Sequence, residues 1–313
     1  MCNILIVPLV TGKECDKVVI KLIIAGIKWL CNVQENIFHQ SILTFAEDFD
    51  ERPDINLKVA MNYNISLPSG KSITKDILDW YIEYEGAHRY HLLKRNDENN
   101  EIRVSLKANE TWSDILIEMS CFNKFTIDFI NIVLLEVVFR NGLLFHNGLV
   151  IHSSCLEFKG EAIAFAAPSG TGKSTHARLW QEIYDAHVVN DDHPAVRIID
   201  GKVIAFGTPW AGERQMFDNS SSALKGFVIL EQGPSNKLWK LNKKDILKEL
   251  LPRCFLPYYC SDLLQKAAEI FSGIINKTNV YKLICKPEPE AAMLVKENVW
   301  PQENEKHRMV SYE

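Results

Sequence analysis

Short runs in which apolar and polar residues alternate dominate the first third of the chain. Such alternation is typical of strands with one buried face. Polar turns such as Asn96–Asn100 separate the runs. The pattern predicts these strands: Ile4–Val10, Ile20–Leu30, Leu57–Tyr63, Trp80–Glu85, His88–Leu93 and Ile102–Leu106. We therefore expect residues 1–122 to form a β-rich domain.

The spacing of the apolar residues changes after this domain. They recur at roughly helical intervals, as at Ile127, Ile130 and Leu134, and Asn141-Gly142 is a pair that commonly ends a helix. The pattern predicts a linking helix within residues 123–148.

Strand and helix patterns alternate in residues 149–313. A Lys159-Gly160 turn and an Asp200-Gly201 turn separate neighbouring strands. The expected elements are strands at Leu149–Leu156, Ala162–Ala166, His187–Val189, Ala195–Ile199, Lys202–Ala205 and Gly226–Glu231, and helices at Gly172–Tyr184, Asp245–Leu251 and Ser261–Ile275. This order is typical of an α/β core. Together with the β-rich first part it predicts an α+β protein.

The net charge and the composition limit which kinds of partner the protein is expected to bind. The chain has 35 Lys and Arg against 40 Asp and Glu, a net charge of −5, without a block of basic residues. This balance argues against nucleic acid or an anionic membrane as the main partner. Lys21 and Glu136 interrupt candidate membrane spans, and Met1–Val10 has no basic residue ahead of it, as a signal peptide would. The eight cysteines contain no Cys-x-x-Cys pair, so we expect reduced thiols and a cytoplasmic protein.

The sequence Ala167-Pro-Ser-Gly-Thr-Gly-Lys173-Ser174-Thr175 fits a phosphate-binding loop in its Ala-first variant. It follows a predicted strand and opens a predicted helix, as such loops do. Gly170 and Gly172 would let backbone N–H groups turn toward phosphates. Lys173 would reach the outer phosphates, and the Ser174 hydroxyl would bind Mg²⁺. The motif predicts ATP as a ligand, and a Gly-rich turn without a ligand is the alternative.

An Asp191-Asp192 pair ends the next predicted strand, eighteen residues after Lys173. Phosphoryl transfer needs one carboxylate for the metal and one to orient or deprotonate the acceptor. Neighbouring strand residues face opposite ways, so both acids reach one site only if the strand ends or bulges there. A solvated Asp-Asp turn is the alternative.

This combination resembles the HPr kinase and phosphoenolpyruvate carboxykinase group of phosphate-loop proteins. Ser169-Gly-Thr-Gly-Lys173, together with the aspartate pair, is similar to the corresponding motifs of the carboxykinases. Ile151-His152-Ser153 is similar to the Leu-His-Gly motif that precedes the phosphate loop in HPr kinases. The resemblance covers roughly residues 149–233 and implies a phosphate-loop kinase core. The chain lacks a match to the oxaloacetate region of carboxykinases, so decarboxylation is not expected.

The resemblance also implies individual roles. The nucleotide would contact the loop residues Ser169, Gly170, Thr171, Gly172, Lys173, Ser174 and Thr175. Ser174 and Asp191 would hold Mg²⁺, and Asp192 would act as base with His152 as its partner. The two aspartates can exchange roles. For His152, a purely structural place on a buried strand is the alternative.

The segment Gly207-Thr-Pro-Trp-Ala-Gly-Glu213-Arg214 resembles the Gly-x-Pro-Trp segment of HPr-kinase-like proteins. Those proteins modify peptides or small hydroxyl compounds. The resemblance implies that Glu213 is a second catalytic acid and that Arg214 binds a phosphate. A packed turn with an exposed Glu-Arg pair is the alternative.

These observations lead to one functional hypothesis. The chain is expected to be an Mg²⁺-dependent kinase that transfers the γ-phosphate of ATP to a hydroxyl, above all a serine of a peptide or protein. The β-rich domain, residues 1–122, would recognise the acceptor. A kinase of a free small molecule such as serine and a non-catalytic nucleotide-binding accessory protein are the alternatives. The sequence leaves the oligomeric state open, a homo-oligomer included.

Overall fold

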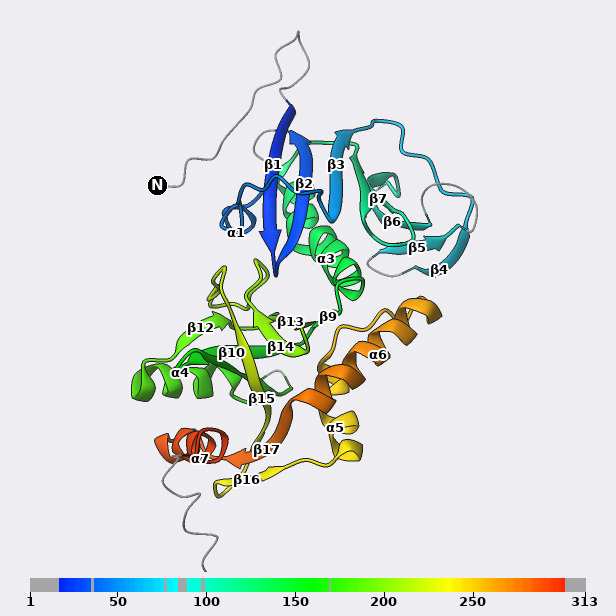
Figure 1. The fold of residues 1–313 in the computed structure, drawn as a ribbon. Helices are drawn as coiled ribbons and strands as arrows, with labels where there is room; N and C mark the ends of the chain where they lie inside the picture. The colour runs from blue at the N-terminus through cyan, green and yellow to red at the C-terminus, as the bar shows by residue number, and fades with distance from the viewer. Residues whose placement is uncertain are drawn as a thin grey trace, which may run out of the picture. The chain divides into compact units, whose positions relative to one another are not determined.

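Two compact units make up the chain in the computed structural model (Figure 1). Unit 1 comprises Met1–His146 and Pro257–Lys266, and unit 2 comprises Asn147–Leu256 and Ala267–Glu313. Each contains one β-sheet and a minority of helix, so the molecule is a mixed α and β protein. The structure describes residues 17–34, 37–75, 78–83, 89–96, 99–168 and 170–301. The predicted strand Ile4–Val10 lies outside these residues.

The sheet of unit 1 has the order β1-β2-β3-β8-β7-β6-β5-β4. The β2–β3 and β3–β8 pairs are parallel and the other pairs are antiparallel. Its strands are β1 (Lys17–Ile24), β2 (Ile27–Gln34), β3 (Ile55–Met61), β4 (Lys71–Lys75), β5 (Asp79–Ile82), β6 (Tyr90–Arg95), β7 (Ile102–Ala108) and β8 (Asp114–Met119). The sequence pattern missed β4 and β8.

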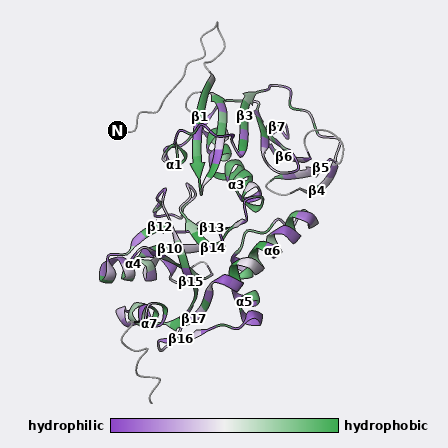
Figure 2. Ribbon diagram, in the orientation of Figure 1, coloured by the Kyte–Doolittle hydropathy of each residue, from purple (hydrophilic) through white to green (hydrophobic). Residues whose placement is uncertain are grey.

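The single strand predicted over Ile20–Leu30 is wrong, because that stretch is a β-hairpin. β1 and β2 pair antiparallel around Ala25 and Gly26, whose φ angles are 52° and 72°. Two successive left-handed residues are the conformation of a tight hairpin turn. Leu22 to Ile27 are all apolar or glycine, so no polar residue marks the turn, and much of the β1 ribbon is green (Figure 2). Periodicity alone therefore did not reveal the turn.

The helical segment of unit 1 consists of α2 (Lys124–Phe129), a π-turn η1 (Ile130–Leu134) and α3 (Leu135–Leu144), and a short α1 (Gln40–Leu43) precedes it in the chain. Unit 1 thus includes the segment that we expected to link two domains. Asn141-Gly142 does not close the helix as predicted. The Asn141 side chain bonds to Val137 O within the helix, and a Cβ on Gly142 would lie 3.0 Å from Ile55 Cδ1. Glycine at this position therefore allows the helix to pack closely against Ile55.

The sheet of unit 2 has the order β12-β10-β11-β15-β14-β13-β9, and β17 pairs with both β15 and β16. Its strands are β9 (Gly148–Val150), β10 (Ser153–Phe158), β11 (Glu161–Ala166), β12 (His187–Asn190), β13 (Ala195–Ile199), β14 (Lys202–Phe206), β15 (Ser221–Gln232), β16 (Lys237–Lys240) and β17 (Asn279–Cys285). The sequence pattern missed β16 and β17.

The helices after the first strands of unit 2 are α4 (Lys173–Tyr184), α5 (Lys243–Glu249), the 3₁₀ turn η2 (Leu251–Arg253) and α7 (Pro289–Val299). The helix α6 (Ser261–Lys277) begins in unit 1 and belongs to unit 2 from Ala267 on. α7 was not expected from the sequence. The strand predicted over Leu149–Leu156 is divided at Ile151 and His152, which separate β9 from β10. Ile151 forms an isolated bridge with Cys254 instead. This interruption matters because His152 lies within it.

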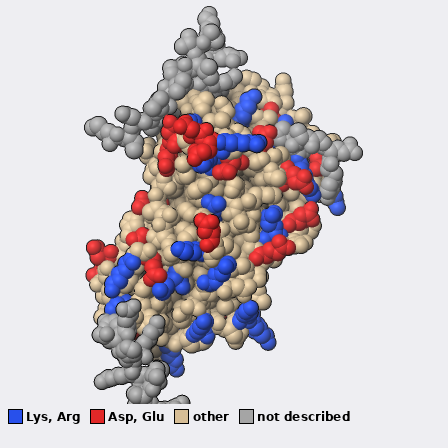
Figure 3. Space-filling model, in the orientation of Figure 1, with Lys and Arg blue, Asp and Glu red and all other residues tan. Residues whose placement is uncertain are grey.

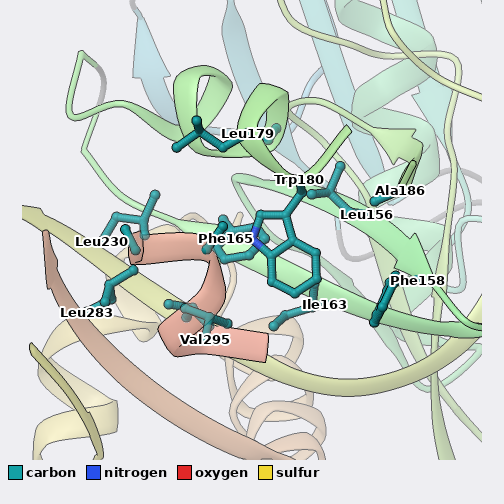
Figure 4. Close-up of a cluster of buried hydrophobic side chains, with 14 of the residues drawn as sticks. Leu156, Phe158, Ile163, Phe165, Leu179, Trp180, Ala186, Leu230, Leu283 and Val295 are labelled. Carbon is teal, nitrogen blue, oxygen red and sulfur yellow. The ribbon is translucent and has the colours of Figure 1, made fainter. Parts of the chain in front are cut away.

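The core of unit 2 surrounds Trp180 of α4, which is fully buried (Figure 4). Phe158 meets the Trp180 ring edge-on at 5.7 Å, and Phe165 lies 5.8 Å from it. Leu230, Leu283 and other apolar residues complete the cluster. Burial of such large side chains is the main stabilising term in folding. It holds α4 against the sheet and so positions the loop that precedes the helix.

The surface carries charges of both signs. On the face in Figure 3, Lys and Arg side chains are interspersed with Asp and Glu side chains. Among the described residues, no helix combines the length and the apolar character needed to cross a membrane.

Candidate functional site

The loop from Ala167 to Gly172 connects β11 to α4. Ala167 is buried at the end of the strand, and Gly170 and Gly172 have φ angles of 77° and 110°. No heavy atom would lie within 4 Å of a Cβ at either glycine. Glycine is therefore required at these two positions by the backbone conformation and not by close packing, because left-handed backbone favours glycine. Ser169 lies outside the described residues.

Lys173 is the first residue of α4, and its ammonium group points back under the loop. Its Nζ lies 2.7 Å from His152 Nε2 and 3.2 Å from Ala167 O. Burial, as the largest cause, and the nearby charge of Arg253 lower the pKa of Lys173, whereas Asp192 opposes them. The lysine is thus oriented by two acceptors in a partly desolvated site.

His152 connects Lys173 to Asp192. An ammonium group has only donors, so His152 Nε2 accepts from it and the ring proton resides on Nδ1. Nδ1 lies 3.4 Å from Asp192 Oδ1. Burial and the charge of Lys173 lower the pKa of His152. A neutral imidazole with this tautomer therefore aligns the carboxylate with the lysine.

Asp192 lies in a turn that Asn190 builds. Asn190 Oδ1 accepts from the N–H of Asp192 at 2.9 Å and of His193 at 2.7 Å. The Asn190 amide donates to Thr208 O and to Trp210 O. The chain leaves the strand direction right after β12, which lets the two aspartates avoid the opposite orientations of strand neighbours.

The Asp192 carboxylate has histidines on both sides. His193 Nε2 lies 3.2 Å from Oδ2, opposite the contact with His152. Burial raises the pKa of Asp192, but the His193 hydrogen bond and the charges of His193, His152 and Lys173 outweigh it and lower the pKa overall. Asp192 is accordingly ionised at neutral pH, the state in which a carboxylate accepts a proton.

Asp191 faces the loop that contains residues 207–214. Gly212 N donates to Asp191 Oδ1 at 2.7 Å, and Asp191 is buried. The same loop brings Arg214 to α4, where Nη1 lies 3.4 Å from Ser174 O. Glu213 is exposed in a turn. The contacts of the described residues therefore link Asp191 and Arg214 to the site and give Glu213 no evident place in it.

The predicted residues thus fall into different groups. His152, Lys173 and Asp192 form one contact chain, and Asp191 lies beside it in sequence but contacts a different loop. Ser174 is exposed in the first turn of α4, next to Thr175. Thr171 O accepts from Gln232 Nε2 at 3.3 Å, at the end of β15.

Sequence reasoning missed the parts played by Asn190, His193 and Arg253. Asn190 and His193 flank the aspartate pair, so adjacency to the pair was the available signal. Arg253 lies sixty residues further along the chain, and its main-chain O accepts from His152 N at 2.7 Å. No sequence pattern pointed to this arginine, because only the fold brings it to His152.

The structure brings one group of side chains within reach of a common divalent cation, and the predicted Mg²⁺ ligands are different residues. Ser174 and Asp191 offer a hydroxyl and carboxylate oxygens, the ligands that Mg²⁺ prefers. Gly212 N donates to Asp191 Oδ1, and the carboxylate keeps further lone pairs that could bind a metal. His152, Asp192 and His193 place one ligand atom each within 4.8 Å of one another. That second donor set, with two imidazoles, suits zinc-like ions better than Mg²⁺.

Comparison with known proteins gives little further information. No protein-family model matches the chain, and no curated protein is similar to it in sequence. Among solved structures, the HPr(Ser) kinase/phosphatase from Coxiella burnetii is similar at 12% identity and a TM-score of 0.28. The similarity covers 51% of this chain and 97% of that one. A similarity at this level identifies neither a family nor an activity.

Proposed function

We propose that this chain is an ATP-dependent kinase that transfers the γ-phosphate to a hydroxyl, with a serine of a peptide or protein as the acceptor. The observation that carries the proposal is the contact chain from Lys173 through His152 to Asp192, directly beside a glycine loop at a helix N-terminus. A loop of this kind cradles phosphates with backbone N–H groups and a lysine. A carboxylate at hydrogen-bonding distance from that machinery is what an acceptor hydroxyl needs.

The residues would divide the work as follows. Lys173 would exchange its contact with His152 for the outer phosphates of ATP. Asp192, ionised and oriented by two histidines, would take the proton of the acceptor hydroxyl. Ser174 and Asp191 would hold Mg²⁺, which neutralises charge on the phosphates. Arg214, which contacts Ser174 O in the first turn of α4, would place a further positive charge near the phosphates of the nucleotide. Glu213 remains a candidate acid without a structural argument.

The acceptor is inferred from the resemblance of residues 207–214 to the Gly-x-Pro-Trp segment of HPr-kinase-like proteins, which modify peptides or small hydroxyl compounds. In this chain the segment borders the aspartate pair through Gly212 and Asp191. An acceptor bound against it would have its hydroxyl near Asp192.

A transfer screen with γ-labelled ATP and Mg²⁺ tests the function. We expect label in one or more serine-containing peptides or proteins and none in their Ser→Ala counterparts. Free serine belongs in the same screen, and label in it alone would favour the small-molecule kinase. Tight ATP binding without transfer to any acceptor would favour a nucleotide-binding accessory protein.

Lys173→Ala provides the internal control of that screen. We expect it to abolish transfer and to weaken ATP binding, because one cationic ligand of the phosphates is lost while the loop backbone remains. Circular dichroism would verify that the variant folds. Near-normal turnover in a folded Lys173→Ala protein would contradict the phosphate-loop assignment.

A further inference from the structure

A group of lysines lies on the surface of unit 2, in β16 and α5. They fall within residues 237–248, a stretch whose one acidic residue is Asp245. All of them are exposed, and in the part of the chain that the structure describes they form no ion pair. The lower part of the face in Figure 3, where β16 and α5 lie, is mainly blue. This lysine surface consists of Lys237, Lys240, Lys243, Lys244 and Lys248.

Two large apolar side chains stand among these lysines. Trp239 is 43% exposed in β16, and Leu247 is 49% exposed on α5, whereas Ile246 of the same helix is buried. Trp239 is opposite Lys282 of β17, and Lys282 Nζ contacts Glu249 of α5 at 3.0 Å. Directly opposed residues project from the same face of a sheet. Trp239 and α5 therefore belong to one continuous surface.

β16 also presents an open sheet edge. It pairs with β17, and among the described residues it has no second partner strand. Leu241 N donates to Val280 O at 2.8 Å, and in an antiparallel pair every second residue repeats that bonding. The alternation directs the main-chain N–H and C=O groups of Leu238 and Lys240 away from β17. An extended peptide can add to such an edge as a further strand.

Several kinds of occupant can be compared for this surface. Lysines on an edge strand discourage pairing with other chains, but that role does not explain the lysines of α5 or the exposed Trp239. A second copy of this chain is disfavoured, because two lysine surfaces would repel each other. A membrane or a long nucleic acid would also meet the rest of the protein, which is more acidic than the overall charge of −5. A short acidic peptide meets the lysine surface alone.

We propose that β16 and α5 bind an acidic segment of the acceptor peptide, which adds to β16 as an extended strand. The identity of this ligand as the acceptor rests on the proposed kinase function. Acidic side chains of the segment contact the lysines, and its main chain pairs with Leu238 and Lys240. An apolar side chain of the segment packs on Trp239. The site lies in unit 2, which also carries the phosphate loop.

Fluorescence polarisation with three labelled peptides tests the site without ATP. The first peptide alternates Glu and Val, the second has Lys in place of Glu, and the third is the Glu-Val peptide with alternate main-chain nitrogens methylated. We expect the first to bind, less tightly at high salt because exposed charges are screened, and the second not to bind. The third should bind about tenfold more weakly, since it loses main-chain hydrogen bonds.

Two outcomes of this measurement would contradict the proposal. Equal affinity for the first and third peptides would overturn the addition of a strand to β16. Absence of Glu-Val peptide binding to the wild-type protein would overturn the site as a whole. Phosphatidylserine vesicles and a DNA duplex belong in the same series, and binding of either one without binding of the Glu-Val peptide would assign the surface to that polyanion instead.

The double variant Lys243→Glu, Lys244→Glu locates the peptide on the protein. Both residues lie in the first turn of α5, where glutamate suits the helix dipole, so the fold is preserved. Binding of the Glu-Val peptide should weaken roughly tenfold, since two attractive contacts become repulsive. Lys159→Glu, Lys202→Glu is the matched control, because both lysines are exposed in unit 2 outside the lysine surface. Equal loss of affinity in the two double variants would overturn the location.

The transfer assay separates this inference from the kinase function. A serine peptide extended by the Glu-Val segment should have a lower KM than the same peptide without it, at unchanged kcat. The Lys243→Glu, Lys244→Glu protein should lose that gain, and an extension without effect on KM would overturn the acceptor assignment. A wild-type protein that binds the Glu-Val peptide but transfers no phosphate would contradict the kinase function alone.

Discussion

Asp191 and Asp192 are sequence neighbours whose carboxylates have different surroundings. Asp192 interacts with two histidines, whereas Asp191 accepts a backbone N–H from Gly212. This difference favours Asp192 as the base and Asp191 as the metal ligand. We therefore expect Asp192→Asn to transfer phosphate at least about a hundredfold more slowly, since an amide cannot accept the proton. Its Mg-ATP binding should stay nearly normal, and extra Mg²⁺ should not restore the rate.

Asp191→Asn should behave differently, with a raised Mg²⁺ requirement and partial recovery of the rate when Mg²⁺ is added. The transfer rates of both variants are measured as Mg²⁺ is titrated at saturating ATP and acceptor. Wild-type rates in both would mean that the pair is a surface turn. Exchanged behaviour would reverse only the assignment within the pair.

At the scale of elements, the loop after β14 is held close to its neighbours by a glycine. A Cβ on Gly207 would lie 1.7 Å from Asp218 O and 2.8 Å from Val189 O. Backbone atoms cannot move aside as a flexible side chain can. We expect Gly207→Ala to lower the free energy of unfolding by about 3 kcal/mol, at the upper end of ordinary overpacking. It should also weaken Mg-ATP binding, because the displaced loop carries Gly212 away from Asp191.

Urea unfolding of Gly207→Ala and of Gly160→Asn measures this effect. Gly160 is a suitable control, since its φ of 77° suits asparagine and no heavy atom would lie within 4 Å of a Cβ there. A Gly207→Ala protein as stable as this control would show that the close approach is not required.

For the whole molecule, the two units allow a test of where the nucleotide binds. A ligand at a hundred times its Kd stabilises the folded state that binds it by about 2.7 kcal/mol. We expect Mg-ATP to slow hydrogen exchange in α4, in the loop before it and in residues 207–214, all of unit 2. Exchange in unit 1 should stay unchanged. Lys173→Ala should lose the protection, and equal protection of unit 1 would argue against a site confined to unit 2.

Much of the local structure followed from the sequence. β3, β7, β11 and α4 lie close to where the sequence pattern predicted them. Buried and exposed residues alternate in β3, as in a strand with one buried face, whereas β11 is a short run of almost continuously buried residues. The exceptions have physical causes. Continuous apolar residues hid the Ala25-Gly26 turn, and the β9–β10 interruption depends on a pairing with Cys254 that is remote in sequence.

The sequence by itself determined that a glycine loop and a lysine are followed, after one helix and one strand, by an aspartate pair, because each of these motifs consists of neighbouring residues whose chemistry can be read locally. Only the tertiary structure decided which of them meet. The turn built by Asn190 gives the two aspartates different partners, and the pairing of His152 with Arg253 brings an arginine to the lysine. The pairing of His152 with Arg253 rests on a main-chain hydrogen bond between distant segments. Such a bond does not depend on side-chain identity, so no local pattern records it.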